Sequence, residues 1–517
     1  MNELEAKFLV AVGKKPKGIL RRVLQELSWA GYLARPKGPT LVMDTYFDSE
    51  DSLLQKSGWT YRVRHNEDGQ TLTLKQIGTG QRGIFKREEI EQPLADALIR
   101  AEFPPPGPVA DMLTRALPRD VCLNPLFELH NHRTRYHLTH PEHPDALIEL
   151  SLDQVTVDAK DSLSYTELEF ELVQGPDDAL NDLLVVLEQQ PNLIRARVGK
   201  FHRGLLANGC EASHAEAIVH PITNVKCRWV DLELQHLQQQ LQLLKLYEPL
   251  AWESVHPEGV HQMRVTTRRV RAGLRAFANV LPPRAAEKLA KDIRWLTRNL
   301  GPVRDLDVHL EHLHTYQDLL SIEERPALLR YQRHLEKRRR QAHRSLIAAL
   351  ASDEYTWLIE DFGTLLAETK VFEGPNQSMS IREAAEQQVR PMLDRVLRKG
   401  RAIDKSSAPA KLHRLRIDAK RLRYQLEYLL TPYGKPMVRA AKALRNLQNT
   451  LGDHQDAYVA MAQLTSFCDH TSLNRVERKA FKQLVALEVD NAARHRKRFA
   501  KDWRRFEARS AGVKQLI

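Results

Sequence analysis

Residues 167–172 read Glu167-Leu168-Glu169-Phe170-Glu171-Leu172, a strict alternation of carboxylate and large apolar side chains. In a β-strand, side chains two positions apart lie on the same face of the sheet. The three glutamates therefore share one face and the apolar residues share the other. Like charges side by side on a sheet are destabilising, so this ladder indicates a face on which cations lie between the carboxylates.

Period-two alternation recurs throughout the first 205 residues and is typical of strands. The predicted strands are 3–10, 41–48, 59–65, 70–76, 84–91, 127–138, 146–152 and 165–172. Helical patterns interrupt them at about 17–31, 93–101, 108–117 and 177–189.

The charged faces of these strands carry both signs in blocks. They hold Glu3, Glu5 and Lys7; Arg62 and Arg64; Lys75; Arg87, Glu89 and Glu91; Arg133 and Arg135; Glu149 and Asp153; and the 167–172 ladder. A sheet with one solvated face also alternates, and for a single segment that interpretation is the simpler one. Many segments behaving alike favour a charged face that binds ions, where carboxylates suit Mg²⁺ and Arg and Lys suit phosphates.

Charge is divided unevenly along the 517 residues. Residues 1–218 hold 25 Lys and Arg against 32 Asp and Glu, a balance of −7. Residues 219–517 hold 53 against 34, a balance of +19. The second part should attract polyanions, unless its surplus Arg and Lys only coat solvated helix faces.

Simple features exclude several classes of protein. The four cysteines form no CxxC pair, which argues against a disulfide framework and a zinc site. The longest apolar runs, such as 183–187, are too short to cross a bilayer, and the charged first residues do not resemble a secretory signal. The chain has no Gly-x-x-x-x-Gly-Lys phosphate loop. We expect a cytoplasmic protein with no membrane partner and no nucleic-acid partner.

From about residue 219 onward, long helical patterns replace the strands, and this region repeats itself. The segment 261–271 matches 413–423 at an offset of 152, and Leu300-Gly301-x-x-x-Asp305 matches Leu451-Gly452-x-x-x-Asp456 at an offset of 151. Two features in the same order at nearly the same spacing indicate an internal duplication. The predicted boundaries are a strand-rich domain at 1–205, a linker at 206–218 and a helical domain at 219–510, with repeats at about 219–365 and 380–510.

Basic residues recur at helical spacing in both copies. His261, Arg264, Arg268, Arg271 and Arg275 form one stripe, and His413, Arg416, Lys420 and Arg423 form its counterpart. Stacked like charges repel, so the stripes favour an anion-binding surface, with a solvated helix face as the alternative. The run Arg338-Arg339-Arg340 is interpreted as a solvated face.

The ordered motifs resemble two known families. Glu3-x-Glu5-x-Lys7 and the charged pairs that follow it, ending at Lys200-x-x-Arg203, resemble the CYTH or triphosphate tunnel metalloenzyme family over residues 1–205. The basic stripes and what we interpret as two Leu-Gly-x-x-x-Asp turns resemble the CHAD domain. The resemblance implies an α+β multidomain protein, with an eight-stranded antiparallel β tunnel surrounded by helices and an all-α duplicated helical bundle.

The resemblance also implies roles for the charged residues. Glu3, Glu5, Glu169 and Glu171 would hold a first Mg²⁺ or Mn²⁺. Candidates for a second metal, or for positioning the attacking water, are Asp153, Glu149, Glu89, Glu91 and Glu167. The residues that would neutralise phosphate oxygens are Lys7, Arg62, Arg64, Lys75, Arg87, Arg133, Arg135, Lys200 and Arg203. Polyphosphate would bind His261, Arg264, Arg268, Arg271, His413, Arg416, Lys420 and Arg423.

The combination of families resembles bacterial inorganic triphosphatases, which implies hydrolysis of tripolyphosphate to diphosphate and phosphate. Two alternatives stay open at this point. One is another CYTH chemistry, namely hydrolysis of thiamine triphosphate or a nucleoside triphosphate, or adenylate cyclisation. The other is a polyphosphate-binding protein with little catalysis.

Overall fold

The computed structural model describes residues 2–11, 15–78, 83–94, 104–118, 121–159, 162–187, 190, 192–209, 222–404 and 406–517. The chain divides into two compact units. The first unit comprises Met1–Ile218 and Leu246–Val260, and the second comprises Val219–Lys245 and His261–Ile517.

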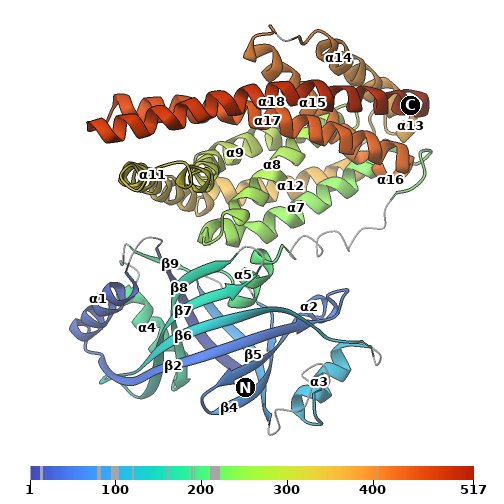
Figure 1. Cartoon of the computed structure of the whole chain (residues 1–517). Coiled ribbons are helices and arrows are strands. Elements are labelled where there is room, and N and C mark those ends of the chain that lie inside the picture. The colour runs from blue at the N-terminus through green and yellow to red at the C-terminus, as the bar shows by residue number, and fades with distance from the viewer. Residues whose placement is uncertain are drawn as a thin grey trace. The chain divides into compact units, whose positions relative to one another are not determined.

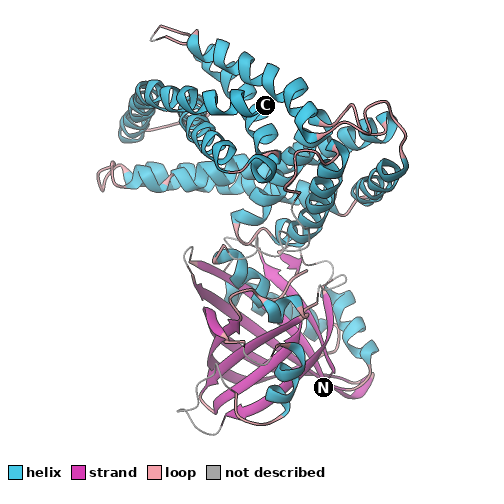
Figure 2. Ribbon diagram, turned by 90° about the vertical axis from the view of Figure 1, so that its right-hand side faces the viewer, coloured by secondary structure: helices cyan, strands magenta, loops and turns pink. Residues whose placement is uncertain are grey.

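The first unit is built on a closed antiparallel barrel (Figures 1 and 2). Its strands are β1 (Asn2–Val10), β2 (Leu33–Asp48), β3 (Trp59–Asn66), β4 (Gly69–Gln76), β5 (Ile84–Leu94), β6 (Asn124–His140), β7 (His143–Asp158) and β8 (Leu163–Gln174). They follow the order β5-β4-β3-β2-β6-β7-β8-β1, and β5 pairs with β1 to close the ring. The eight predicted strands and the tunnel are confirmed. A ninth strand, β9 (Leu193–Arg195), was not predicted; it pairs with β1.

The barrel closes because each strand presents its apolar residues to the outside, where helices cover them. Helices α1 (Pro16–Trp29) and α4 (Asp177–Leu187) pack on the outer face of β1 and β6 to β8. Phe8, Phe170 and Leu150 from the strands meet Leu27 and Leu183 from the helices in that core. The charged residues of the same strands must then point inward, since successive side chains alternate.

Three further helices pack on the barrel in the described part of residues 1–218. Helices α2 (Leu53–Lys56) and α3 (Pro108–Ala116) cover the outer face of β3 to β5. Helix α5 (Lys200–Ala207), which was not predicted, packs closely on β6. A Cβ on Gly204 would lie 2.1 Å from the Phe127 ring, so only glycine allows this approach. The prediction of a helix at 93–101 is wrong for its first two residues, because residues 93–94 are the last residues of β5. The rest of the predicted helix lies outside the described residues.

The second unit is helical throughout its described part. It contains most of α7 (Trp229–Glu253) and most of α8 (Pro257–Ala276). The last turns of α7 and the first turn of α8 belong to the first unit. The other elements are α9 (Pro283–His312), α10 (His314–Gln317), α11 (Arg325–Leu350), α12 (Asp353–Val371), α13 (Ile381–Ala384), η1 (Ala385–Val389), α14 (Arg390–Arg401), α15 (Pro409–Tyr428), α16 (Leu430–Tyr433), α17 (Lys435–Asp469) and α18 (Arg475–Leu516).

The duplication appears as two matching helix pairs, α8 with α9 and α15 with α17. The Leu-Gly-x-x-x-Asp segments are not turns, contrary to the sequence-based interpretation. They lie inside the long helices α9 and α17, although Pro302 follows Gly301. Buried Leu300, Val303 and Leu306 hold that part of α9 in the core, so tertiary packing outweighs the helix-breaking tendency of Gly and Pro.

Candidate functional site

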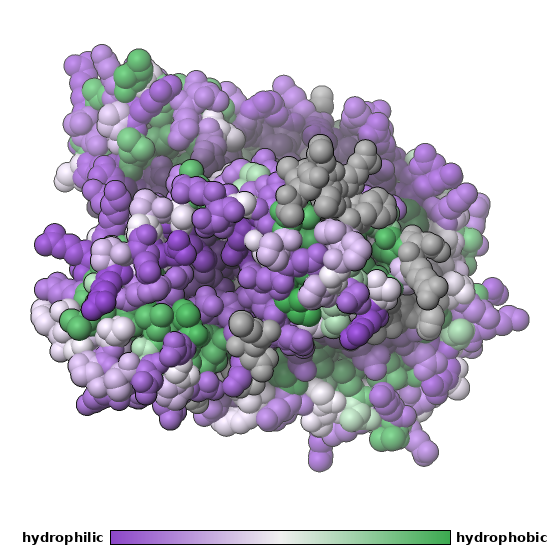
Figure 3. Space-filling model, turned by 90° about the horizontal axis from the view of Figure 1, so that it is seen from below, coloured by the Kyte–Doolittle hydropathy of each residue, from purple (hydrophilic) through white to green (hydrophobic). Residues whose placement is uncertain are grey.

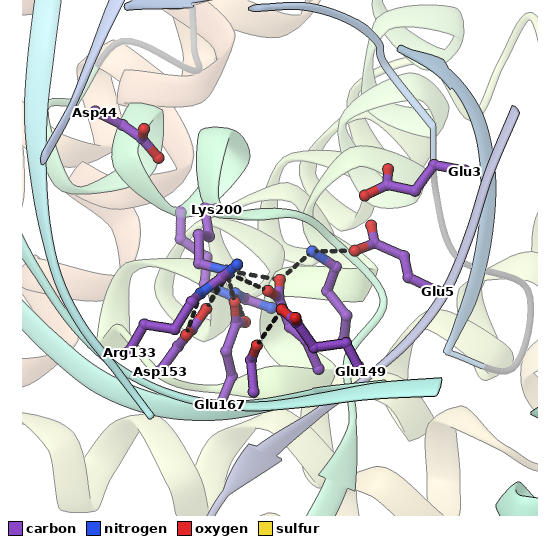
Figure 4. Close-up of polar contacts among 12 residues, drawn as sticks. Glu3, Glu5, Asp44, Arg133, Glu149, Asp153, Glu167 and Lys200 are labelled. Atoms are coloured by element: carbon purple, nitrogen blue, oxygen red, sulfur yellow. Dashed lines mark hydrogen bonds and ion pairs between the residues drawn. The ribbon is translucent and has the colours of Figure 1, made fainter. Parts of the chain in front are cut away.

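The barrel interior contains a cavity of about 750 Å³. Figure 3 shows hydrophilic side chains around a hollow on the face of the barrel seen from below. The predicted charged residues that line the cavity are Glu3, Glu5, Lys7, Arg62, Arg64, Lys75, Arg87, Glu89, Glu91, Arg133, Glu169, Glu171 and Lys200. In Figure 4, Glu3 and Glu5 of β1 lie across the interior from Asp44 of β2.

The first strand supplies both signs of charge to one wall. Lys7 Nζ lies 2.9 Å from Glu5 and also contacts Glu169 of β8. Glu5 accepts a hydrogen bond from Arg87 of β5, and Lys75 of β4 contacts Glu3. Burial alone would raise the pKa of Glu5, but Lys7, Lys75 and Arg87 outweigh burial and lower it to about 2. Glu5 is therefore ionised at any physiological pH.

A second cluster surrounds Lys200, which helix α5 places against the last two strands (Figure 4). Lys200 Nζ lies 2.9 Å from Asp153 and 2.6 Å from Glu169, and it also contacts Glu167. Arg133 adds two hydrogen bonds to Asp153, of 2.8 and 2.7 Å. Although burial opposes charge there, these carboxylates raise the pKa of Lys200 well above its usual value. The cluster is a neutralised network.

A third cluster joins β2 to β3 around Asp44, which is 1% exposed. Arg64 donates two hydrogen bonds to Asp44, of 2.8 and 3.0 Å, and Arg62 adds a longer one of 3.5 Å. Burial would raise the pKa of Asp44, but Arg64 and Arg62 outweigh it and lower the pKa. Arg62 also bonds Glu89 at 3.2 Å. Asp44 thus holds two cationic lining residues in place.

Five predicted site residues do not line the cavity. Asp153, Glu167 and Arg203 lie behind it as partners of the Lys200 cluster. Arg135 and Glu149 are 3.9 Å apart, and His137 also approaches Glu149 at 3.6 Å. Glu91 does line the cavity and accepts a 3.4 Å hydrogen bond from Thr73.

The strand register places carboxylates directly opposite one another. Glu171 of β8 faces Glu5 of β1 on one side and Glu149 of β7 on the other. Burial, together with Glu3, Glu5 and Glu169, raises the pKa of Glu171 to about 7. Burial and Glu5 also raise the pKa of Glu3. At this wall the cations of the protein do not balance the negative charge.

The carboxylates of the interior fit a hard divalent cation. Each of Asp153, Glu167 and Glu169 offers one oxygen, and these oxygens lie within 4.8 Å of one another. Glu171, whose pKa is raised by burial and by Glu3, Glu5 and Glu169, is the least neutralised of these carboxylates, and a cation beside it would relieve the repulsion described above. Mg²⁺ and Mn²⁺ accept such all-oxygen ligand sets.

Hydrogen-bond donors in the same cavity fit an anion. The Nε atoms of Arg62 and Arg87 are buried and have no hydrogen-bond partner among the described residues. A buried donor left unpaired costs free energy, and guanidinium groups match phosphate oxygens well. Carboxylates that suit a cation therefore share the cavity with donors that suit a phosphate chain.

The helical unit brings the two basic stripes together. Lys420 of α15 lies among Arg268 and Arg264 of α8 and Arg416 and Arg423 of its own helix. Burial, followed by these four guanidinium groups, lowers the pKa of Lys420 to about 7. Two of the guanidinium groups, those of Arg268 and Arg423, have buried Nε atoms without a hydrogen-bond partner among the described residues. We call these five side chains the basic cluster.

Each duplicated glycine lies near an arginine of a neighbouring helix. Arg264 donates hydrogen bonds to the Gly301 carbonyl at 3.1 Å and to Asp305 at 2.7 Å. In the second copy, a Cβ on Gly452 would lie 3.5 Å from Arg416. In both copies the glycine of the Leu-Gly-x-x-x-Asp motif therefore lies within contact distance of an arginine of a neighbouring helix.

Other basic residues lie apart from this cluster. Arg271 is near Arg294 rather than Lys420, and His413 is exposed. Burial, Arg304 and Arg268 lower the pKa of His261 to about 4, so its ring is neutral. The interpretation of Arg338-Arg339-Arg340 as a solvated face is wrong for Arg339, because its guanidinium pairs with buried Asp307.

Comparison with known proteins agrees with this geometry. Residues 1–205 match the CYTH domain family, and residues 235–465 match the CHAD domain family. The chain combines a CYTH domain with a CHAD domain.

An uncharacterised protein of Mycobacterium tuberculosis is 25% identical over 461 residues, which cover 83% of this chain and 82% of that protein. An inorganic triphosphatase of Haemophilus influenzae is 28% identical over 164 residues, which cover 32% of this chain and 45% of that protein. The crystal structure of the CHAD domain from Ricinus communis is 26% identical with a TM-score of 0.46, over 55% of this chain and 96% of that one.

Two residues that pair with charged residues of the barrel, Asp44 and Glu253, were not predicted from the sequence. Asp44 could have been found, because Leu41 to Asp48 alternates and places Asp44 on the same face as Tyr46. Glu253, which pairs with Arg203, lies 50 residues away from it and carries no local signal. In the described part of the chain, no helix is both long and apolar enough to span a membrane.

Proposed function

We propose that the CYTH domain hydrolyses inorganic triphosphate to diphosphate and phosphate with Mg²⁺ or Mn²⁺. The observation that carries this proposal is the mixed lining of the barrel cavity. Unbalanced carboxylates on one wall suit a divalent cation, and unpaired guanidinium donors suit phosphate oxygens. The likeness to an inorganic triphosphatase points to the same chemistry.

The residues of the chain have separate roles in this proposal. Lys7, Arg87 and Arg133 neutralise phosphate oxygens, together with Arg62, Arg64, Lys75 and Lys200. Glu3, Glu5 and Glu171, with Glu169 beside them, hold the metal, which when bound polarises the phosphates. Asp153 and Glu167 complete a second carboxylate group with Glu169. Phosphoryl transfer needs positioning and charge neutralisation more than covalent help, and a closed barrel supplies both.

The distribution of cations favours an unesterified triphosphate over a nucleotide. The cationic lining residues come from β1, β3, β4, β5, β6 and α5, so cations surround the cavity. Tripolyphosphate carries charged oxygens along its whole length and can use all of them. A nucleoside would place a largely neutral group against desolvated charges, which costs free energy.

A phosphate-release assay on the full chain tests the proposal. Tripolyphosphate, ATP, thiamine triphosphate and diphosphate are compared with Mg²⁺ or Mn²⁺, and with EDTA. We expect tripolyphosphate to have the highest kcat/KM, EDTA to abolish release, and added metal to restore it. A higher kcat/KM for ATP or thiamine triphosphate would overturn the choice of substrate. Glu169→Gln should abolish release, whereas Glu88→Gln on the exposed face of β5 should not.

For the CHAD domain we propose binding of inorganic polyphosphate at the basic cluster. Five cationic side chains from both repeats lie close together, and burial followed by their mutual repulsion lowers the pKa of Lys420. A polyanion would remove that repulsion and pair the buried Nε donors of Arg268 and Arg423. A flexible phosphate chain can follow such a surface without base-specific contacts.

A further inference from the structure

Glu253, the last residue of α7, belongs to the charged network of the barrel through its ion pair with Arg203. Its side chain is 1% exposed. Arg203 of α5 donates hydrogen bonds to both of its oxygens, at 2.7 and 3.0 Å. The backbone N–H groups of Arg197 and Val198 add bonds of 2.7 and 3.0 Å. All of these residues belong to the same compact unit.

Arg203 links this carboxylate to the predicted metal ligands. Its Nη1 lies 2.6 Å from Glu167, which is fully buried. Glu167 in turn contacts Lys200, and Lys200 lies 2.6 Å from Glu169. Four consecutive charged contacts therefore run from Glu253 to a residue that lines the cavity.

The charge balance makes Glu253 more than a packing residue. Arg203 is 1% exposed and lies between two carboxylates, Glu167 and Glu253. Without Glu253, the whole charge of Arg203 would be balanced by Glu167 alone. Glu167 would then be drawn toward Arg203 and away from a metal ion. Breaking one partner of a buried charge network is costly for the charges that remain.

The segment around Glu253 is anchored independently. Trp252 Nε1 donates a 3.2 Å hydrogen bond to the Arg195 carbonyl, and the Arg197 guanidinium lies 3.6 Å from the Trp252 ring centroid. Glu248, one and a half turns earlier on α7, also pairs with Arg197. Among the described residues Glu248 pairs with Arg197 and not with a member of the Lys200 cluster, which makes it a matched control for Glu253.

We infer that Glu253 is a positioning residue for the carboxylates of the barrel interior, acting through Arg203 on Glu167. The functional CYTH unit thus extends beyond residues 1–205 to include 246–260. This inference rests on one part of the proposed function, the binding of a divalent cation. It does not depend on which triphosphate is the substrate. A chain that ends at residue 205 lacks Glu253 and leaves Arg203 with one carboxylate partner.

The test measures Mn²⁺ binding to the full-length protein by electron paramagnetic resonance, with no substrate present. The variants are Glu253→Gln, Glu253→Asp and Glu248→Gln. We expect Glu253→Gln to weaken Mn²⁺ binding about ten-fold, as is usual when a partner of a metal ligand is lost. Glu253→Asp keeps the charge and should recover most of the affinity. Glu248→Gln should stay within two-fold of the wild type.

Tripolyphosphate kinetics provide a second measurement. Glu253→Gln should lower kcat at saturating metal while KM for tripolyphosphate changes little, because Glu253 does not line the cavity. If Glu253→Gln does not fold, the double variant Arg203→Gln/Glu253→Gln removes both charges; its Mn²⁺ affinity should be no lower than that of Arg203→Gln alone.

Equal Mn²⁺ affinities for Glu253→Gln and Glu248→Gln would overturn the inference. If the wild-type chain binds Mn²⁺ but hydrolyses no triphosphate, weaker Mn²⁺ binding by Glu253→Gln would still support Glu253 as a positioning residue. That result would reject only the proposed hydrolysis.

Discussion

Glu171 of β8 lies directly opposite Glu5 of β1 in the antiparallel register. Like charges in that position repel, and burial adds to the cost of ionising Glu171. The barrel nevertheless keeps both carboxylates on its inner wall. We expect this arrangement to lower stability in the absence of a cation and to favour binding of a divalent cation.

Glu171→Gln should therefore stabilise the metal-free protein and weaken its response to metal. Relief of the repulsion is worth about 1 kcal/mol. Thermal unfolding in EDTA should show a higher Tm than the wild type, and saturating Mn²⁺ should raise that Tm less, since binding stabilises the folded state in proportion to affinity. Glu88→Gln, on the exposed face of β5, should leave both values unchanged. A lower Tm in EDTA would contradict this account of Glu171.

Asp44 should be essential for stability as well as for the site. Asp44→Ala leaves Arg62 and Arg64 without their buried partner, and we expect a loss of about 3 kcal/mol in the free energy of unfolding. Urea denaturation followed by circular dichroism measures this loss. Asp145→Ala, at an exposed position on β7, serves as the control and should change the free energy by less than about 0.5 kcal/mol. Similar losses in the two variants would mean that Asp44 is not a structural anchor.

The basic cluster should give polyphosphate binding a steep salt dependence. Each phosphate that Lys or Arg neutralises releases a condensed counterion; for duplex DNA the slope of log affinity against log salt is about −0.9 per contact. Replacing Arg264, Arg268, Arg416 and Arg423 together by alanine should weaken binding and flatten the slope, as measured by fluorescence anisotropy with labelled polyphosphate.

The matched control replaces four exposed basic residues of α11 and α18, namely Lys337, Arg338, Arg478 and Lys482. It removes the same charge from surfaces outside the cluster. Equal losses in the two variants would show a diffuse electrostatic surface instead of a defined site. Tighter binding of duplex DNA or RNA than of polyphosphate would assign the cluster to nucleic acid.

Polyphosphate affinity should also fall as pH rises through 7. The pKa of Lys420 is about 7 because of burial and of Arg268, Arg416, Arg423 and Arg264 around it. A bound anion favours the charged form, so binding takes up a proton and is stronger at pH 6 than at pH 8. Lys420→Arg keeps its charge throughout this range and should remove that part of the pH dependence. An unchanged pH profile in Lys420→Arg would show that Lys420 stays charged in the free protein.

The eight strands and the duplicated helical domain could be predicted because each leaves a local trace, whereas the closed tunnel was implied by the resemblance to the CYTH family. Alternation with period two reports which side of a strand is charged, and the offsets of 152 and 151 report the repeat. The Leu-Gly-x-x-x-Asp segments were misread as turns, because Gly and Pro favour turns locally while buried Leu300 and Val303 keep the helix intact.

The sequence by itself determined which charged residues of one strand share a face, since side-chain alternation is a property of the strand alone. Only the tertiary structure decided which of them neutralise one another. Lys200 meets Asp153 and Glu169 because α5 packs back on the barrel through Gly204, and Arg203 meets Glu253 across 50 residues. Charge pairing depends on distances of a few ångströms between distant segments, and no local pattern encodes those distances.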